Sequence, residues 1–276
     1  MPVRQPAEQA PRNDSIDFMD KQIKNVALAA VKKSGQLLKK EYVKFNRPDV
    51  MLKSHREILT KADLLSQELI IGEISGHFPG HDIISEERAN RKINSEYVWY
   101  LDPIDGTTNF SMHNPLWSVS IALARRHELA LGIIYAPMLA EIYLAQAGRG
   151  AFLNGKKIQV SSVSQGKVIN TFCHGGKDAS IKKVLAYVRR QKLQTLDCRQ
   201  LGSAAIELAY VAGGRVESFL SPGMRDWDVA AGVLLVREAG GKVTDFRGKD
   251  WRLGEPNLAA SNGKIHAQIL KAVNGK

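Results

Sequence analysis

Hydrophobic positions recur at two different spacings along the chain, and they predict a helical beginning followed by a β-rich middle. Between residues 16 and 45, apolar side chains recur at helical spacing and predict one long helix, and we expect a second helix after Asp63. Short β-rich runs separated by turn residues follow at 82–85, 97–101, 117–126, 128–137 and 141–148. The sequence Asn-Gly-Lys at 154–156 is typical of a hairpin turn, so we expect an antiparallel meander after residue 110.

From about residue 165 the pattern changes to strands that alternate with helices. Strands are predicted at 168–173, 216–220, 242–246 and 257–261, and helices at 179–192, 203–212, 227–239 and the C-terminus. This alternation predicts an α/β arrangement. We therefore expect a disordered tail (1–15), an N-terminal α+β half with an antiparallel sheet and most of the metal ligands (16–160), and a C-terminal α/β half (161–276).

Composition and charge narrow the class of protein. The chain has 276 residues, is 44% hydrophobic and 24% charged, and carries a formal net charge of +11. It contains no long apolar run that would cross a membrane and no apolar core of a signal peptide near its start, so we expect a cytoplasmic protein. Cys173 and Cys198 show no metal-ligand spacing and are interpreted as reduced thiols. The basic stretches 31–47 and 181–192 are interpreted as solvated helix faces, because no nucleic-acid-binding motif accompanies them.

Carboxylates stand where several predicted elements begin or end. These are Asp63, Glu86, Asp102, Asp105 and Asp228, with Glu87 interpreted as a solvated neighbour of Glu86. Such carboxylates converge easily on one crevice, and a hard cation is needed to balance their charge. An all-oxygen set favours Mg²⁺, Mn²⁺ or Ca²⁺ over zinc, and two or three such ions would suit phosphoryl transfer.

The segment WYLDPIDGTTNF (99–110) carries the sharpest signal. Its turn would present Asp102, the carbonyl of Ile104 and Asp105 together, and Gly106 permits a tight backbone. The residues that follow Gly106 look like the start of a short helix whose N–H groups could hold a phosphate. Haloacid-dehalogenase phosphatases carry D-x-D-x-T, but Pro103 occupies the place of their nucleophile here, which argues against a covalent aspartyl-phosphate.

Together with WDVAAGVLLVREAGG (227–241), this segment resembles the inositol monophosphatase family. The family belongs to a superfamily that also holds fructose-1,6-bisphosphatases and 3′-phosphoadenosine phosphatases. Weaker matches run in family order at 52–63, 83–87, 148–161 and 201–214. The resemblance implies an α+β fold, a layered αβαβα sandwich, with Mg²⁺ dependence (Mn²⁺ as a substitute), inhibition by lithium and a homodimer.

The resemblance also implies roles for particular residues. Asp63 and Thr107 would orient the attacking water, and Gly106 and Thr107 would cradle the phosphate. Lys53 resembles a lysine in a mobile loop near the site. The implied metal ligands are Glu86, Asp102, the Ile104 carbonyl, Asp105 and Asp228. The segment Gly202, Ser203 and Ala204 matches the part of the family that touches the hydroxyl-bearing ring of the substrate.

Two departures leave the substrate open. Many inositol phosphatases carry an acidic residue, which binds sugar-like hydroxyls, at the position of Ser221. The segment between Glu86 and Asp102 is also shorter than in the animal enzymes, as in prokaryotic members with broader specificity. The leading hypothesis is a Mg²⁺-dependent phosphomonoesterase acting on inositol 1-phosphate or a related polyol or sugar phosphate by metal-activated water. The alternatives are histidinol phosphate or fructose 1,6-bisphosphate as substrate, or an added role in binding RNA or transcription complexes.

Overall fold

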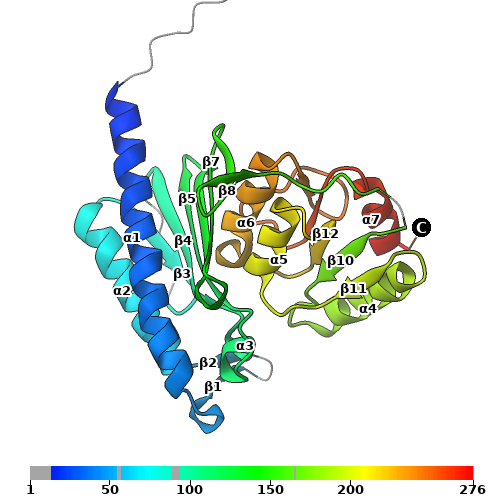
Figure 1. The fold of residues 1–276 in the computed structure, drawn as a ribbon, viewed down its shortest axis with the longest axis horizontal. Coiled ribbons are helices and arrows are strands. Elements are labelled where there is room, and N and C mark those ends of the chain that lie inside the picture. The colour runs from blue at the N-terminus through cyan, green and yellow to red at the C-terminus, as the bar shows by residue number, and fades with distance from the viewer. Residues whose placement is uncertain (1–13, 55–56, 89–93, 165, 276) are drawn as a thin grey trace, which may run out of the picture.

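The computed structural model describes residues 14–54, 57–88, 94–164 and 166–275, so most of the predicted tail lies outside the described residues. The chain forms five layers, with helices outside, between and beyond two sheets (Figure 1). This arrangement confirms the predicted αβαβα sandwich. The division of the chain near residue 160 stays a prediction.

The first layer consists of two helices that pack on each other and on one face of the larger sheet. They are α1 (Asp14–Lys44) and α2 (Lys61–His77), joined by the 3₁₀ turn η1 (Arg47–Asp49) and the hairpin of β1 (Met51–Ser54) and β2 (Glu57–Leu59). α1 begins two residues before the predicted start. α2 begins before Asp63 rather than after it, because Thr60 is the N-cap and Asp63 lies in the first turn.

The larger sheet has seven strands in the order β3-β4-β5-β6-β7-β8-β9. Their bounds are β3 (Asp82–Ser85), β4 (Tyr97–Asp105), β5 (Ser118–Arg125), β6 (Glu128–Ala136), β7 (Glu141–Gln146), β8 (Gly150–Leu153) and β9 (Lys156–Ile158). β3 pairs with β4 in parallel and all the other pairs are antiparallel, which confirms the predicted meander. Two short helices interrupt it, α3 (Thr107–Ser111) after β4 and the 3₁₀ turn η2 (Pro137–Leu139) after β6.

The smaller sheet has five strands in the order β11-β10-β12-β14-β13. The strands are β10 (Ile169–Phe172), β11 (Asp197–Arg199), β12 (Ser218–Ser221), β13 (Lys242–Thr244) and β14 (Leu258–Ser261). Helices α5 (Ala204–Ala212) and α6 (Asp226–Glu238) lie between the two sheets, and α4 (Asp178–Lys192) and α7 (His266–Val273) cover the far face (Figure 1).

The larger sheet is buried on both faces, and its side chains alternate between two cores. On β5, Val119 and Ile121 pack with α1 and α2, whereas Ala122 and Ala124 face α5 and α6. The small residues on the second face let α6 approach closely. A Cβ at Gly132 of β6 would lie 2.7 Å from the carbonyl oxygen of Ala231, so this contact fixes the distance between α6 and the sheet.

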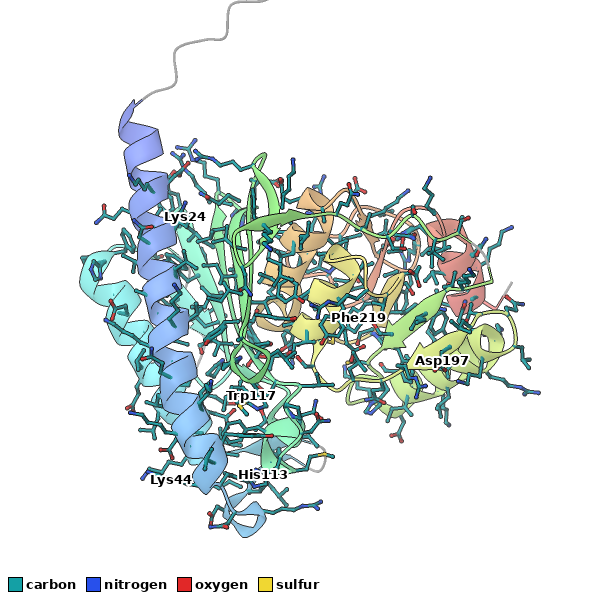
Figure 2. All side chains as sticks on the ribbon, viewed as in Figure 1. Lys24, Lys44, His113, Trp117, Asp197 and Phe219 are labelled. Atoms are coloured by element: carbon teal, nitrogen blue, oxygen red, sulfur yellow. The ribbon has the colours of Figure 1, made fainter. Side chains whose placement is uncertain are left out.

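The two large cores include aromatic side chains, some of them beside the acidic motif at the end of β4. Trp117, just before β5, is fully buried and its ring packs on Phe110 of α3 and on Tyr42 of α1. Phe219 of β12 belongs to the core between the sheets (Figure 2). The aromatic contacts of Trp117 and Phe110 therefore anchor α3, which follows the end of β4.

Candidate active site

The end of β4 carries a bulge that brings two aspartates to the same face of the sheet. Asp102 pairs with Ser120 and Asp105 pairs with Ser118, so β4 uses three residue steps where β5 uses two. In a regular strand, residues three apart point to opposite faces. Because Ser118 and Ser120 share a face, the extra residue turns Asp102 and Asp105 to one side. Pro103 lies in the bulge, where its missing N–H breaks no ladder hydrogen bond.

The structure corrects the prediction that β4 ends before the acidic turn. The strand extends through Asp105, because its pairing with β5 resumes after the bulge. Asp102 is 2% exposed, and its Oδ1 accepts a hydrogen bond from the Ile104 N–H at 3.0 Å. The motif is therefore a buried, irregular strand end rather than a surface turn.

The carboxylate of Asp105 lies against the N-terminus of α5. Its Oδ1 accepts from the Ala204 N–H at 3.1 Å and its Oδ2 from the Ala205 N–H at 2.9 Å, and the Ser203 hydroxyl also donates to Oδ2. Free N–H groups and the helix dipole both favour a negative charge at this position. Ser203 and Ala204, predicted to touch substrate, thus contact a predicted metal ligand here.

Asp63 and Thr107 are brought together from different elements. Asp63, in the first turn of α2, is fully buried and its Oδ2 accepts from the N–H and hydroxyl of Thr60 at 2.7 and 2.6 Å. Its Oδ1 lies 3.3 Å from the Thr107 hydroxyl, which is also 3.0 Å from the Ile104 carbonyl oxygen. The Thr107 hydroxyl therefore sits between Asp63 and a predicted metal ligand.

Asp228 and Glu86 approach the same region from α6 and from the turn after β3. Asp228 is half-buried in the first turn of α6, where its Oδ2 accepts from the Arg225 N–H at 2.8 Å. The Glu86 N–H donates to the Leu101 carbonyl at 3.2 Å, which ties this turn to β4. Both residues lie close enough to Asp102 for their charges to raise its pKa.

Burial dominates the electrostatics of the cluster. It raises the pKa of Asp63 to about 7, that of Asp105 to about 6 and that of Asp228 to about 8, and it raises the pKa of Asp102 well above its usual range. Neighbouring carboxylates raise these pKa values further, and Glu86 contributes to each of them. Hydrogen bonds oppose the shifts: Thr60 donates to Asp63, Ser203 to Asp105 and Arg225 to Asp228. A bound cation would relieve this repulsion.

The donor set fits a hard divalent cation by its chemistry. Buried carboxylates and the Ile104 carbonyl are the oxygen ligands that Mg²⁺ prefers. In the part of the chain that the structure describes, no group of three or more His, Cys, Asp or Glu side chains is arranged to hold a metal ion. Asp63, Asp105 and Asp228 each turn at least one oxygen to a backbone N–H or hydroxyl.

Two glycines shape the backbone beside the cluster. Gly106 is the N-cap of α3 with a φ of 94°, and a Cβ there would lie 3.1 Å from the carbonyl oxygens of both Gly202 and Leu116. Gly202 has a φ of 85°, and its Cβ would lie 3.0 Å from Nδ2 of Asn109. These positions require glycine, so the segments 106–109 and 201–203 pack directly on each other.

Two residues that were predicted to lie near the substrate, Ser221 and Lys53, are not seen in contact with the acidic cluster among the described side chains. Ser221 is fully buried at the end of β12, and its hydroxyl lies 3.0 Å from the Met224 sulfur. The backbone of Lys53 lies in β1, but its side chain lies outside the described residues. The role of either residue in substrate binding stays a prediction.

Several polar residues outside the sequence motifs hold the site in place. Ser66 of α2 donates to the Pro103 carbonyl at 3.0 Å, and its hydroxyl lies 2.7 Å from that of Ser34 on α1. Gln67 accepts from the Ser85 hydroxyl and from the Glu87 N–H. Asn109 donates to the carbonyls of Leu116 and Leu201 at 2.6 and 2.7 Å. Ser66 and Gln67 could have been found from the sequence, because they are polar residues on an otherwise apolar face of α2.

Glu207 of α5 is a further buried acid that the sequence did not single out. It is fully buried, and its Oε1 accepts from the N–H groups of Leu201 and Gly202, both at 3.0 Å. Burial raises its pKa to about 8. Glu207 thereby holds the segment whose next residues contact Asp105.

Comparison with known proteins shows the family to which the chain belongs. Residues 19–276 match the model of the inositol monophosphatase family. The chain is 36% identical to a fructose-1,6-bisphosphatase/inositol-1-monophosphatase of Thermotoga maritima, covering 95% of this chain and 96% of the relative. It is also 36% identical to Nus factor SuhB of Escherichia coli strain K12, covering 89% of this chain and 93% of the relative.

A solved structure supports the same assignment. The extragenic suppressor protein suhB of Bartonella henselae superposes with a TM-score of 0.85 at 33% identity, covering 91% of this chain and 98% of that chain. The chain therefore belongs to the inositol monophosphatase family, whose activity is that of a phosphatase.

Proposed function

We propose that this protein is a Mg²⁺-dependent phosphomonoesterase that hydrolyses inositol 1-phosphate or a related polyol or sugar phosphate. The observation that carries the proposal is the convergence of Asp102, Asp105, Asp228 and Glu86 beside the Asp63–Thr107 pair. A phosphate ester needs its charge balanced and a water activated next to it, and this arrangement supplies groups for both.

Two or three Mg²⁺ ions would be held by Glu86, Asp102, the Ile104 carbonyl, Asp105 and Asp228, with Mn²⁺ as a substitute. When bound, such ions neutralise the phosphate ester and lower the pKa of water. The protein's own part is to position that water. The Thr107 hydroxyl lies within hydrogen-bond distance of both Asp63 and the Ile104 carbonyl, and its oxygen could accept a hydrogen bond from the water.

The phosphate and the ring of the substrate would lie against the adjoining backbone segments. The first N–H groups of α3, around Gly106 and Thr107, have no partner four residues earlier and suit a phosphate oxygen. Gly202, Ser203 and Ala204 border the same space across the tight contact with Gly106. Attack is direct, without a covalent intermediate, because Pro103 stands where an aspartate nucleophile of the dehalogenase type would be.

The substrate is the least constrained part of the proposal. Ser221 replaces the acidic residue of many inositol phosphatases and lies buried, so no carboxylate at that position selects inositol. One relative carries a name that joins fructose-1,6-bisphosphatase with inositol-1-monophosphatase activity. Fructose 1,6-bisphosphate and histidinol phosphate are therefore the alternative substrates.

Phosphate release from a substrate panel tests the proposal. The panel comprises inositol 1-phosphate, glycerol 2-phosphate, fructose 1,6-bisphosphate, histidinol phosphate and 3′-phosphoadenosine 5′-phosphate, each with Mg²⁺, with EDTA and with added Li⁺. We expect Mg²⁺-dependent and Li⁺-sensitive release that Asp105→Asn abolishes. No release from any of the five would overturn the enzyme proposal. We also propose a homodimer, which the family resemblance implies, and a cytoplasmic location, which the sequence features predict.

A second candidate function is binding to RNA or to transcription complexes. The supporting observation is the similarity to Nus factor SuhB over most of the chain, together with the net charge of +11. RNA binding that weakens steeply with salt and survives Asp105→Asn would support it. RNA affinity that is weak and insensitive to salt would exclude it.

A further inference from the structure

A cavity of about 590 Å³ lies between the β5–β6 turn, the last turn of α6 and the segment after β13. Its size falls within the range of about 300–1,000 Å³ that is usual for small-molecule sites. Its charged and polar lining consists of His127, Glu128, Arg237, Lys242, Asp250 and Arg252. Leu129 and Trp251 form part of its buried base.

The cavity is separate from the acidic cluster. Asp228 lies in the first turn of α6, and Arg237 lies in its last turn, about 14 Å farther along the helix axis. β4 runs toward α3, β5 runs back, and the β5–β6 turn therefore lies at the opposite end of the larger sheet (Figure 1). A ligand in this cavity would touch none of the proposed metal ligands.

Among the described residues, no ion pair joins the cations of the cavity to its carboxylates, although the charges of Asp250 and Glu128 act on Arg237. Arg237 donates one N–H to the Trp251 carbonyl, and its guanidinium forms no ion pair within the described part of the chain. Burial lowers the pKa of Arg237, and the charges of Asp250 and Glu128 oppose this shift only in part. Lys242 and Arg252 are exposed at the rim and likewise lack an ion pair among the described residues. An anionic group beside Arg237 would recover the solvation that burial removes.

The carboxylates give the cavity a second kind of contact. Glu128 and Asp250 are exposed in its lining and form no ion pair with its cations among the described residues, so their oxygens can accept hydrogen bonds from a ligand. A ligand that carries an anionic group and several hydroxyls would satisfy both sets. The anion would meet Arg237, Lys242 and Arg252, and the hydroxyls would donate to Glu128 and Asp250.

We infer that this cavity is a second ligand site, which takes a small polyhydroxy anion such as a sugar phosphate or a sugar acid. The phosphate and carboxylate forms share the same recognition, because a guanidinium pairs with either in bidentate geometry. The inference goes beyond the proposed phosphatase activity and does not depend on it.

Calorimetric titration of the full-length, metal-free protein in EDTA tests the inference, because removal of Mg²⁺ suppresses phosphate binding at the acidic cluster. The probes are 6-phosphogluconate, gluconate and glucose. We expect 6-phosphogluconate to bind once per chain and glucose not to bind. Equal affinity for gluconate would identify the carboxylate as the recognised group, and weaker binding of gluconate would identify the phosphate.

Variants separate this cavity from other sites. Arg237→Gln is expected to weaken 6-phosphogluconate at least tenfold, and Arg252→Gln, at an exposed position where folding is not at risk, at least threefold. Arg247→Gln, an exposed arginine outside the cavity, and Asp105→Asn are expected to bind as the unmodified protein does. No binding of 6-phosphogluconate at millimolar concentration, or equal binding by Arg252→Gln and the unmodified protein, would overturn the inference.

Discussion

The Thr107 hydroxyl lies 3.3 Å from Oδ1 of Asp63 although the two residues are 44 positions apart in the chain. Asp63 has its other oxygen occupied by Thr60, so its orientation is fixed before any ligand arrives. The Thr107 hydroxyl also lies 3.0 Å from the Ile104 carbonyl oxygen, so two acceptors hold it in place. The pair is preorganised for accepting a proton or hydrogen bond from water.

Removing the Thr107 hydroxyl tests this pair. Thr107→Val keeps the size of the side chain but loses the hydroxyl, and we expect kcat for phosphate release to fall at least about 100-fold. Thr107→Ser keeps the hydroxyl and is expected to retain activity within about tenfold. A change in KM with kcat preserved in Thr107→Val would assign the hydroxyl to substrate binding instead.

Gly106 provides a test of the backbone conformation. Gly106→Ala places a Cβ at a φ of 94° and within 3.1 Å of two carbonyl oxygens, so we expect a loss of about 1–3 kcal/mol in the free energy of unfolding. The matched control is Gly72→Ala on the exposed face of α2, where a Cβ meets nothing within 4 Å. That change is expected to stabilise the protein by about 0.5–1 kcal/mol in urea unfolding.

The carboxylate cluster predicts how stability depends on pH without metal. Asp63, Asp105 and Asp228 have folded-state pKa values of about 7, 6 and 8, raised above the unfolded value near 4. The folded state therefore binds more protons, and stability is lost as pH rises from about 4 through about 8. Urea unfolding in EDTA should show a lower free energy at pH 8 than at pH 5.5.

Metal addition should reverse that trend. Because a divalent ion binds the ionised carboxylates, Mg²⁺ is expected to stabilise the protein more at pH 8 than at pH 5.5. Asp228→Asn removes one repelling charge and should flatten the pH dependence in EDTA. Stability in EDTA that rises with pH over this range would contradict the burial of these charges.

Replacing the buried acid Glu207 tests how its ionisation affects the stability of the protein. Glu207→Gln keeps an oxygen for the N–H groups of Leu201 and Gly202 but cannot ionise. Since burial raises the pKa of Glu207 to about 8, its ionisation costs stability as pH rises toward and beyond that value. We expect Glu207→Gln to be as stable as the unmodified protein at pH 6 within about 1 kcal/mol and more stable at pH 9.

Most of the fold could be predicted from periodicity and from the family motifs, and the errors have local physical causes. The sequence indicated a strand that stops before Asp102, whereas β4 continues because Asp105 pairs again with Ser118 beyond the bulge. A bulge depends on the register of the partner strand, which a single segment does not encode. The start of α2 was missed although Thr60 and Asp63 have the spacing of a capping box.

The candidate site residues were identified from motifs, but their supporting contacts were not. Asp63 and Thr107 were paired by family resemblance, and the structure brings their side chains together. Glu207 contacts N–H groups only five and six positions earlier. Ser66, Gln67 and Asn109, in contrast, contact backbone groups that lie 20 to 92 positions away in the chain. Such contacts arise only once the layers are assembled, so no local pattern announces them.

The N-terminus of α5 binds the carboxylate of Asp105, which comes from β4 of the larger sheet. This contact has a consequence for how the protein could be divided. Asp105 receives its hydrogen bonds from residues 98 to 100 positions later in the chain. A polypeptide cut near residue 160 would leave one fragment with an unsatisfied buried acid and the other without the acceptor for the N–H groups of Ala204 and Ala205. Neither fragment should release phosphate alone, whereas mixing the two should restore turnover, which would make this protein a natural candidate for split-enzyme complementation.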